Sequence, residues 1–345
     1  MTAKTFLFVA LACFTFGALP SVAQENQTYL HFPGKSGPGQ GKRIVFIAGD
    51  EEYRSEESLP MLAKILSQRH GFDCTVLFSL DPTGTFIDPN NQKSVTNPEA
   101  ISHADLIIIQ TRYRQWSPEE YKYLYDYLNA GKPVIGLRTS THAFTGSGKT
   151  GDFKWADFGL KILGEQWVNH HGQHKVQGTR AVIEPANANH PVLNGVHDVF
   201  ASSDVYTVAN LDEKQAKVLL RGAVTASLDP ASKPIDGPKN NPMMPIAWVR
   251  EYTAPNGTTK GKAFCTTMGA SVDFKNEDLR RLIVNAAFYL GGLEVPQKAD
   301  VTIVDPYEPT MYGFNKDDLY IDRQLKVSDL VLGKSAFTGT GKPKQ

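Results

Sequence analysis

Three histidines in one short segment are the densest group of side chains that could bind a metal or move protons. They are His170, His171 and His174, in N-H-H-G-Q-H. On a helix, the i,i+4 pair and the i,i+3 pair could each share one ion, and zinc is the first expectation for imidazole ligands. In an extended segment, His170 and His171 would instead point to opposite sides. The pattern leaves three roles open: metal ligands, metal-free acid–base or substrate-binding groups, and structural residues.

Acids, arginines and aromatic residues gather in three further segments, each directly after a short apolar run. Together with one histidine, these residue types suit a polar ligand rich in hydroxyl groups. Carboxylates of the first segment could also give an oxygen to a metal held by the histidines. The candidates are Asp50, Glu51, Glu52, Tyr53 and Arg54 in the first segment, Arg112, Tyr113, Arg114 and Trp116 in the second, and Arg138, Ser140 and His142 in the third.

Ser140 is the candidate for a nucleophile in these segments. It follows a strand-like run at a predicted sharp turn into a helix, where related folds place a nucleophile. The glycines of a G-x-S-x-G elbow are absent, and the segment has no cysteine. We therefore expect a helix-capping or loop serine, and we keep a serine amidase or esterase as an alternative function.

The first half of the chain alternates strand-like and helix-like segments. One helical pattern has Ser58 as its expected N-cap and ends at Gly71, and a second begins with a capping box from Ser117 to Glu120 and ends at Gly131. Strands that alternate with helices form right-handed β–α–β units, so the polar segments should meet at the carboxyl ends of parallel strands. Apolar runs typical of strands buried on both faces occur at 43–49, 72–78, 104–110 and 133–137.

The second half is mixed. A final amphipathic helix is expected over 277–290, with Asn276 as its cap and Gly291 after its end. The predicted fold class is therefore α/β: a flavodoxin-like, doubly wound parallel sheet with additional antiparallel strands from the second half. We expect one domain over 42–295 and an irregular tail over 296–345 that wraps it. Further strands are expected at 176–183, 203–208, 216–224, 245–252 and 262–268.

The N-terminus has the features of an export signal. Lys4 precedes an apolar run over 5–19, and Ser21-Val22-Ala23 offers small residues at the cleavage site. We predict a signal peptide over 1–23 and a flexible lead-in over 24–41. The expected location is therefore periplasmic or secreted.

The composition argues against several classes of partner. The formal net charge is zero, with 36 basic and 36 acidic residues and no basic stripe that would bind nucleic acid. No second apolar run of membrane length follows the signal, so no membrane association is expected after cleavage. No nucleotide cofactor is expected, and the sequence does not indicate an oligomeric state. Cys74 and Cys265 lie in separate apolar runs and are expected to be buried thiols rather than a disulfide.

A series of motifs resembles the ThuA-like (trehalose utilisation) family, in an exported form, over residues 42–294. They include I-V-F-I-A-G-D, P-V-I-G-L-R-T-S-T-H-A-F, G-E-Q-W-V-N-H-H, S-D-V-Y and T-T-M-G-A-S. The resemblance implies the flavodoxin-like fold of the class I glutamine-amidotransferase-like superfamily, with His142, His170 and Asp204 in the site. This chain has Ala270 where many relatives have histidine. It also lacks the superfamily's catalytic cysteine, so amidotransferase chemistry is not carried over.

Members of this family are associated with the catabolism of sugars oxidised at C3, whose C2 proton is acidic. Cleavage of such a 3-keto-glycoside needs a base, a cation for the enolate and an acid that releases the aglycone. The resemblance thus implies a lyase, hydrolase or isomerase that acts on a small saccharide. The histidine cluster adds the expectation of a divalent metal as one of its three roles. A noncatalytic sugar-binding module is the alternative that Ala270 supports. We expect catalytic roles for His142, His170, Arg138 and Glu52, and substrate contacts from Asp50, Glu51, Arg54, Arg112, Tyr113, Trp116, Ser140 and Asp204.

Overall fold

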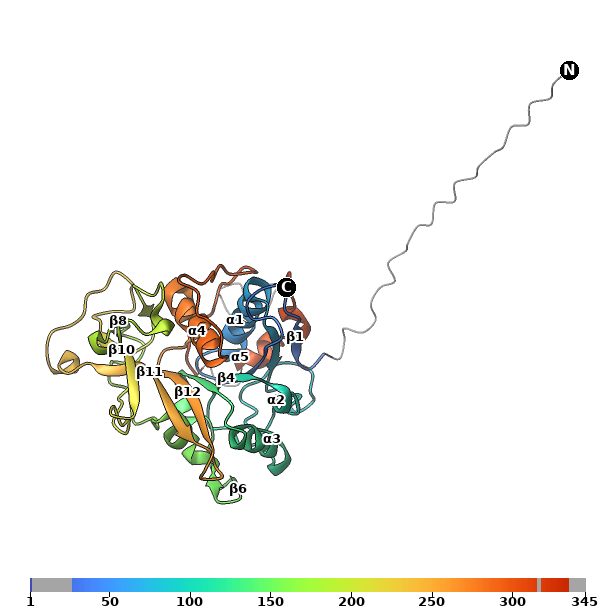
Figure 1. Cartoon of the computed structure of the whole chain (residues 1–345), viewed down its shortest axis with the longest axis horizontal. Helices are drawn as coiled ribbons and strands as arrows, with labels where there is room; N and C mark the ends of the chain where they lie inside the picture. Colours follow the sequence, from blue (N-terminus) through green and yellow to red (C-terminus); the bar gives the residue numbers. More distant parts are fainter. Residues whose placement is uncertain (2–26, 315–317, 335–345) are drawn as a thin grey trace.

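The computed structural model describes residues 1, 27–314 and 318–334 (Figure 1). One mixed sheet of ten strands crosses the molecule in the order β1-β3-β2-β4-β5-β12-β11-β10-β8-β9. The predicted apolar run and cleavage site of the signal peptide lie outside the described residues. Within the described part of the chain, no helix has the length and apolar character needed to span a bilayer.

Five parallel strands form the centre of the sheet. Their order is β3-β2-β4-β5-β12, and within this group each strand runs parallel to its neighbours. The antiparallel strands lie outside this centre, with β1 beyond β3, and β11, β10, β8 and β9 beyond β12. The strands are β1 Leu30–Phe32, β2 Arg43–Gly49, β3 Asp73–Leu77, β4 Leu106–Thr111, β5 Val134–Leu137, β8 Thr179–Ile183, β9 Phe200–Ala201, β10 Ala216–Val224, β11 Met244–Thr253 and β12 Lys260–Thr266, and a separate hairpin pairs β6 Lys149–Thr150 with β7 Phe153–Lys154.

Helices cover both faces of the parallel strands (Figure 1). Helices α1 and α4 share one apolar cluster with Ile44 and Phe46 of β2, whereas α2 and α3 share another with Val45 and Ile47. Successive strand residues point to opposite faces, so burial of both faces explains the continuous apolar run of β2. The predicted doubly wound α/β fold class is confirmed. The helices are α1 Ser55–His70, α2 Ala100–His103, α3 Pro118–Asn129, α4 Glu277–Leu290 and α5 Asp318–Arg323.

Side-chain caps fix the starts of α3 and α4. Ser117 and Glu120 form the predicted capping box, in which the Ser117 hydroxyl accepts from the Glu120 amide and the Glu120 carboxylate accepts from the Ser117 amide. The Asn276 side chain accepts from the amide of Leu279 at 2.8 Å. Both starts agree with the sequence prediction because each depends on neighbouring residues alone.

Helix α1 begins earlier than its sequence indicates. Its first residue is Ser55, whereas the expected N-cap was Ser58. Hydrogen bonds of Asp50 stabilise the turn that precedes α1. Its Oδ1 accepts from the amides of Glu52 and Tyr53, and its own amide donates to the Ser55 hydroxyl. This bonded turn replaces the longer loop expected between β2 and the helix.

Two short segments differ from the sequence expectation. Residues 30–32, within the expected lead-in, form β1, which pairs with β3 and covers an edge of the sheet. Residues 203–208, expected as a strand, have a single isolated bridge, between Tyr206 and His170. Polar side-chain contacts of Asp204 hold that segment in place of a strand ladder.

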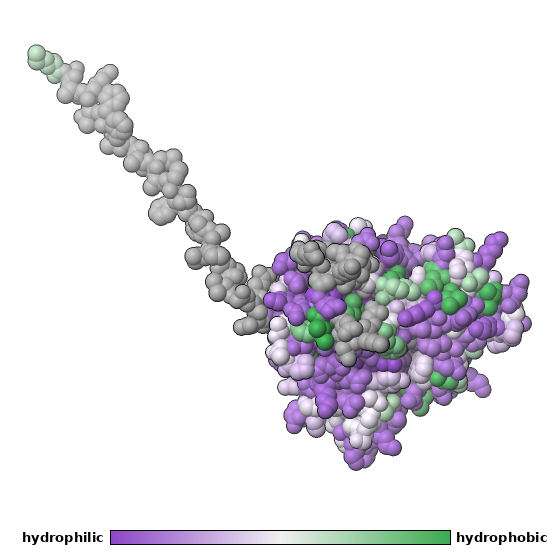
Figure 2. All heavy atoms as spheres, turned by 180° about the vertical axis from the view of Figure 1, so that it is seen from behind, coloured by the Kyte–Doolittle hydropathy of each residue, from purple (hydrophilic) through white to green (hydrophobic). Residues whose placement is uncertain are grey.

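Cys74 and Cys265 are buried, and the surface drawn in Figure 2 is mostly polar. Cys74 and Cys265 are buried free thiols, as predicted. On the face of the molecule drawn in Figure 2, hydrophilic residues predominate and hydrophobic residues form small, separate patches. This distribution is ordinary for a folded domain.

The tail after α4 is bound to the first turn of α1. The Glu57 carboxylate accepts from the Thr310 amide at 2.8 Å and from the Thr310 hydroxyl at 2.6 Å. A guanidinium nitrogen of Arg323, in α5, lies 3.1 Å from Glu57 and 3.4 Å from Glu56. Buried polar interactions therefore fix the described parts of the tail to the domain.

We expect the stability of the protein to fall between about pH 5 and 7 because of Glu56. Burial, and next the charge of Glu57, raise the pKa of Glu56 to about 7, although Arg323 opposes them. The unfolded chain releases this proton near pH 4.5, so a contribution to stability that is complete below that pH is lost as the pH rises toward 7. The free energy of unfolding in urea should fall between pH 5 and pH 7 in both proteins, and the fall should be smaller in Glu56→Gln than in the wild type by about 1 to 3 kcal/mol. Exposed Glu99→Gln is the control, and an unchanged pH slope in Glu56→Gln would contradict the prediction.

Candidate active site

The carboxyl ends of β2, β4 and β5 bring the three polar segments to one edge of the sheet. Residues 50–54 follow β2, residues 112–116 follow β4, and a 3-10 turn, Arg138–His142, follows β5. The Thr139 hydroxyl donates to Asp50 Oδ2 at 2.6 Å, which links the first and third segments. Asp50, predicted to contact substrate, is therefore engaged in holding two loops together.

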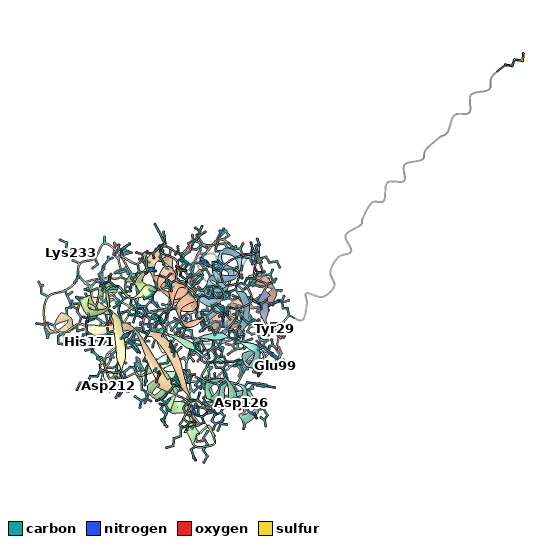
Figure 3. All side chains as sticks on the ribbon, viewed as in Figure 1. Tyr29, Glu99, Asp126, His171, Asp212 and Lys233 are labelled. Carbon is teal, nitrogen blue, oxygen red and sulfur yellow. The ribbon has the colours of Figure 1, made fainter. Side chains whose placement is uncertain are left out.

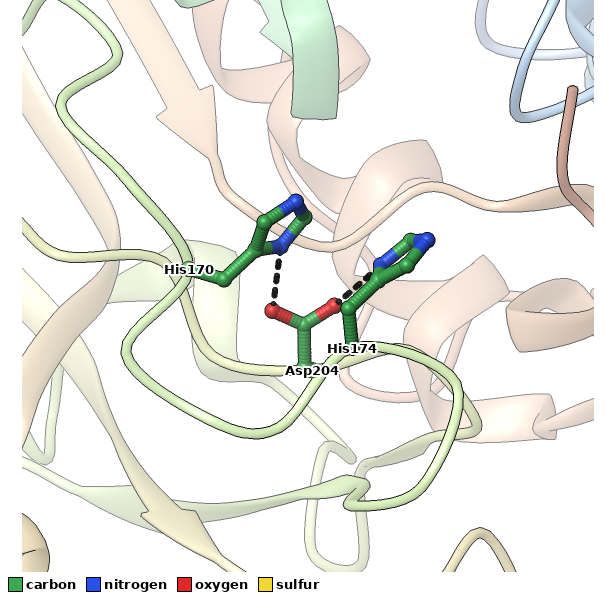
Figure 4. Close-up of side chains that lie close together, drawn as sticks. All are labelled: His170, His174 and Asp204. Carbon is green, nitrogen blue, oxygen red and sulfur yellow. Dashed lines mark hydrogen bonds and ion pairs between the residues drawn. The ribbon is translucent and has the colours of Figure 1, made fainter.

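A buried carboxylate, Asp204, holds two histidines at this edge (Figure 4). His170 Nδ1 lies 2.7 Å from Asp204 Oδ2, and His174 Nδ1 lies 3.2 Å from Asp204 Oδ1. The centroids of the two imidazole rings are 4.4 Å apart. The side chains of His170 and His174 are 32% and 27% exposed. Both rings can thus meet a ligand, and the carboxylate lies behind them.

The charge of Asp204 decides which ring nitrogens are basic. Burial raises the pKa of Asp204, but hydrogen bonds from His170 and His174 and the charge of Arg138 outweigh it, so the pKa lies below its usual value. The carboxylate is therefore ionised and can only accept hydrogen bonds, which assigns the Nδ1 proton to each histidine. The Nε2 atom of each ring is left as the basic nitrogen.

Arg138 supports Asp204 rather than facing a ligand. Its fully buried guanidinium donates to Asp204 Oδ1 at 3.0 Å, to the Asp204 carbonyl at 3.0 Å and to the Thr267 carbonyl at 2.6 Å. The group lies between the rings of Tyr53 and Tyr206, at 4.3 and 4.0 Å from their centroids. These contacts place Arg138, predicted to hold a substrate oxygen, behind Asp204, whose carboxylate it helps to orient.

Glu52 lies beside His174. Its Oε1 is 3.3 Å from His174 Nε2. Burial, and then the charge of Asp50, raise the pKa of Glu52 to about 7, although Arg112 opposes them. A carboxyl group that titrates near neutrality next to an imidazole can act as a general acid or base. Glu52 and His174 therefore form a contiguous pair of acid–base groups, and Asp204 holds the imidazole of His174.

Arg112 is the cation of this edge that a ligand can reach. Its side chain is 19% exposed, whereas that of Arg114 is fully buried. Glu51 accepts from both, through one carboxylate oxygen for each arginine. The Arg112 guanidinium also lies 4.5 Å from the ring centroid of Tyr113 and 4.7 Å from that of Phe314. Glu51 is thus occupied by arginines, while Arg112 can face an anionic oxygen.

His142 is a buried, neutral imidazole near the two histidines. Its ring centroid is 4.9 Å from that of Tyr113 and 5.2 Å from that of Trp167. Burial, and then the charge of Arg112, hold its pKa well below the usual value. His142 is therefore neutral near pH 7, and its lowered pKa makes it a weaker base than a free imidazole. Trp167 also contacts His170, at 5.8 Å between centroids.

His171 does not lie with His170 and His174, the other two histidines of the predicted metal site. Its Nε2 lies 2.7 Å from the Lys239 carbonyl oxygen, and Figure 3 labels it on the side of the molecule that carries β8 and β10. His170 lies in an isolated β-bridge, and adjacent side chains of extended backbone point to opposite sides. The described side chains that could share an ion are instead His170, His174 and Asp204, with one ligand atom from each within 4.8 Å.

Arg54 and Trp116, predicted as substrate contacts, have other partners. Arg54 donates to the Gly313 carbonyl at 2.7 Å and to the Tyr320 hydroxyl at 3.0 Å, and so binds the tail. Trp116 packs against Phe144, at 5.0 Å between ring centroids, in the apolar cluster shared with α3. The structure thus gives both residues contacts within the domain rather than positions beside the histidines.

Ser140 has the surroundings of a structural residue. Its buried hydroxyl oxygen lies 2.6 Å from the Ile109 carbonyl oxygen and 2.9 Å from that of Leu137. We expect Ser140→Ala to keep any hydrolytic activity and to lose about 1 kcal/mol of stability, because it removes a buried hydrogen bond. Labelling with a serine-directed covalent probe and urea unfolding would check this. Specific labelling of Ser140 would favour the amidase or esterase alternative.

The sequence interpretation missed Trp167 and Tyr206, two of the aromatic residues that surround the site. Tyr206 and Tyr53 enclose Arg138, and Trp167 contacts both His142 and His170. The S-D-V-Y motif contained Tyr206 beside Asp204, but aromatic residues are usually core residues and gave no separate signal.

The fold and the site together define a flavodoxin-like α/β protein with a histidine–carboxylate site at the carboxyl edge of its parallel strands. Residues 43–290 match the model of the ThuA family, described as trehalose utilisation. The chain therefore belongs to this family, as the motifs indicated. Family membership supports a sugar-related role.

One solved structure supports the fold, and a second is similar over much of the chain. A ThuA-like protein from Parabacteroides merdae is 14% identical, with a TM-score of 0.50 over 74% of this chain and 92% of that one. A ThuA-like protein from Bacteroides uniformis is 15% identical, with a TM-score of 0.47 over 75% of this chain and 95% of that one. No curated protein matches the sequence.

Proposed function

We propose that this protein is an enzyme that acts on a 3-keto-glycoside or a related oxidised saccharide by acid–base chemistry. The observation that supports this proposal is the attachment of His170 and His174 to Asp204, each through Nδ1. A buried carboxylate that fixes two imidazoles orients their basic nitrogens for proton transfer. The group that titrates near pH 7 beside them, Glu52, supplies an acid.

We assign one role to each group in an elimination. His170 Nε2 removes the C2 proton, which the neighbouring C3 carbonyl makes acidic. The electrons of that C–H bond form an enolate, and Arg112 stabilises the charge on its C3 oxygen. Protonated Glu52 gives its proton to the oxygen on C1 as the C1–O bond breaks. The enolate electrons form a double bond between C1 and C2 and the C3 carbonyl is restored, while the aglycone leaves as an alcohol. His142 is the alternative base to His170.

Synthetic 3-keto-glucosides with a nitrophenol aglycone test this function. The protein should accelerate nitrophenol release from the keto compound, and Glu52→Gln should slow it, because the amide cannot donate an acidic proton. The unoxidised nitrophenyl glucoside is the control, since its C2 proton is not acidic. Saccharide binding without turnover would instead favour the noncatalytic sugar-binding module.

A metal-assisted form of this chemistry rests on a separate observation. His170, His174 and Asp204 place three ligand atoms within 4.8 Å of one another. Two imidazoles and a carboxylate suit a divalent ion, with zinc as the first candidate. Such an ion would polarise the keto oxygen of the substrate. One equivalent of zinc in untagged protein, with joint loss of activity and thermal stability in chelator, would support this form; full activity in chelator would support the metal-free form.

We also propose that the protein acts in the periplasm or outside the cell. The N-terminal sequence has a positive residue, an apolar run and small residues at the expected cleavage site. Cleavage after Ala23 would give a mature protein that begins at Gln24, which N-terminal sequencing can detect.

A further inference from the structure

The C-terminal tail reaches the site and is held on both sides of Tyr312. Before it, Thr310 binds the Glu57 carboxylate through its amide and its hydroxyl. After it, the Gly313 amide donates to the Glu52 carbonyl at 2.8 Å. The position of Tyr312 is therefore set partly by the loop that carries Glu52.

The ring of Tyr312 packs against the rings of the site. Its centroid is 5.0 Å from that of Tyr53 and 5.5 Å from that of His174. Ala270 packs in the same small cluster as the two tyrosines. The tail thus forms one wall beside His174, and a small side chain at position 270 leaves room for it.

The Tyr312 hydroxyl is buried and has no hydrogen-bond partner among the described residues. The backbone of Lys175 is close enough to lower its pKa, but it does not form a hydrogen bond of normal geometry. Burial is the largest influence on this hydroxyl and raises its pKa well above the usual value, although Arg138 opposes it, so the hydroxyl keeps its proton. Because an unpaired buried hydroxyl costs free energy, we expect its partner to be an oxygen that is not part of the chain.

We propose that Tyr312 is a substrate-binding residue, whose hydroxyl donates a hydrogen bond to an oxygen of the saccharide held beside His174. This inference rests on the proposed function, and it makes the C-terminal tail part of the active site. Hydroxyl and carbonyl oxygens of a keto-sugar are suitable acceptors. A site that pairs its buried hydroxyl only with substrate gains selectivity for substrates that carry an oxygen at that position.

The test compares Tyr312→Phe with a matched control, Tyr307→Phe. Tyr307 is buried in the same tail, but its hydroxyl already donates to the Ser271 carbonyl at 2.7 Å. Tyr312→Phe should lower kcat/KM for nitrophenyl 3-keto-glucoside by about 10- to 100-fold and leave the melting temperature unchanged. Tyr307→Phe should lower the melting temperature and keep kcat/KM.

Two results would overturn the inference. If Tyr312→Phe lowered the melting temperature as much as Tyr307→Phe, its hydroxyl would already be paired in the free protein. If Tyr312→Phe kept full kcat/KM, the hydroxyl would not contact the substrate. A wild-type protein without any activity on keto-glucosides would contradict the proposed function instead, and the comparison of melting temperatures would still decide whether the hydroxyl is paired.

Discussion

Asp204→Asn is expected to lose about 3 kcal/mol or more of stability and to lower kcat/KM by about 100-fold or more. Asparagine keeps the shape of aspartate but removes its charge and turns one acceptor into a donor. Arg138 would then be a fully buried cation without its carboxylate. In addition, at least one of His170 and His174 would lose the acceptor that fixes its ring.

Urea unfolding and kcat/KM for nitrophenyl 3-keto-glucoside would measure these two losses separately. Asp212→Asn is the matched control, because Asp212 is exposed and lies in a surface turn (Figure 3). Wild-type stability of Asp204→Asn would contradict the importance of the ion pair with Arg138. Wild-type kcat/KM would contradict the orientation of the histidines as the source of activity.

The parts of the fold that depend on local sequence could be predicted. The strand at 43–49 has its observed bounds because a strand buried on both faces needs a continuous apolar run. Helix α4 starts after Asn276, and its cap bond needs a residue three positions away. By contrast, β1 is only three residues long and depends on pairing with β3, which lies about 40 residues further along the chain, as the register from His31 to Thr75 shows.

The sequence indicates which residue types lie at the candidate site, but it does not indicate which of their side chains contact one another. Whether His170 or His171 faces Asp204 depends on the local backbone, which an isolated bridge determines. Arg138 was expected to bind a ligand, yet it is buried under Asp204, and burial of a charge follows from packing across the whole fold. Tyr312 comes beside His174 through the docking of the tail, a contact for which the spacing of residues gives no signal.

His170→Ala and His174→Ala are each expected to lower kcat/KM by about 100- to 10,000-fold, the range typical of general acid–base groups. His170 is the proposed base, and His174 contacts Glu52, the proposed acid. His171→Ala is the control that the structure offers. It removes the same side chain from the same segment, but its ring binds the Lys239 carbonyl instead of Asp204. His171→Ala should therefore keep kcat/KM near the wild-type value and lose at most the stability of one hydrogen bond.

The double variant His170→Ala/His174→Ala shows whether the two rings act together. If both belong to one acid–base group held by Asp204, the second substitution should add little to the first, because residues that act as a unit are non-additive. Metal content in the same variants separates the two forms of the proposed chemistry: a metal site would lose its ion in either single variant and keep it in His171→Ala. A loss of kcat/KM in His171→Ala as large as in His170→Ala would show that the ring of His171 turns toward the site in solution, and would contradict the arrangement described for Asp204.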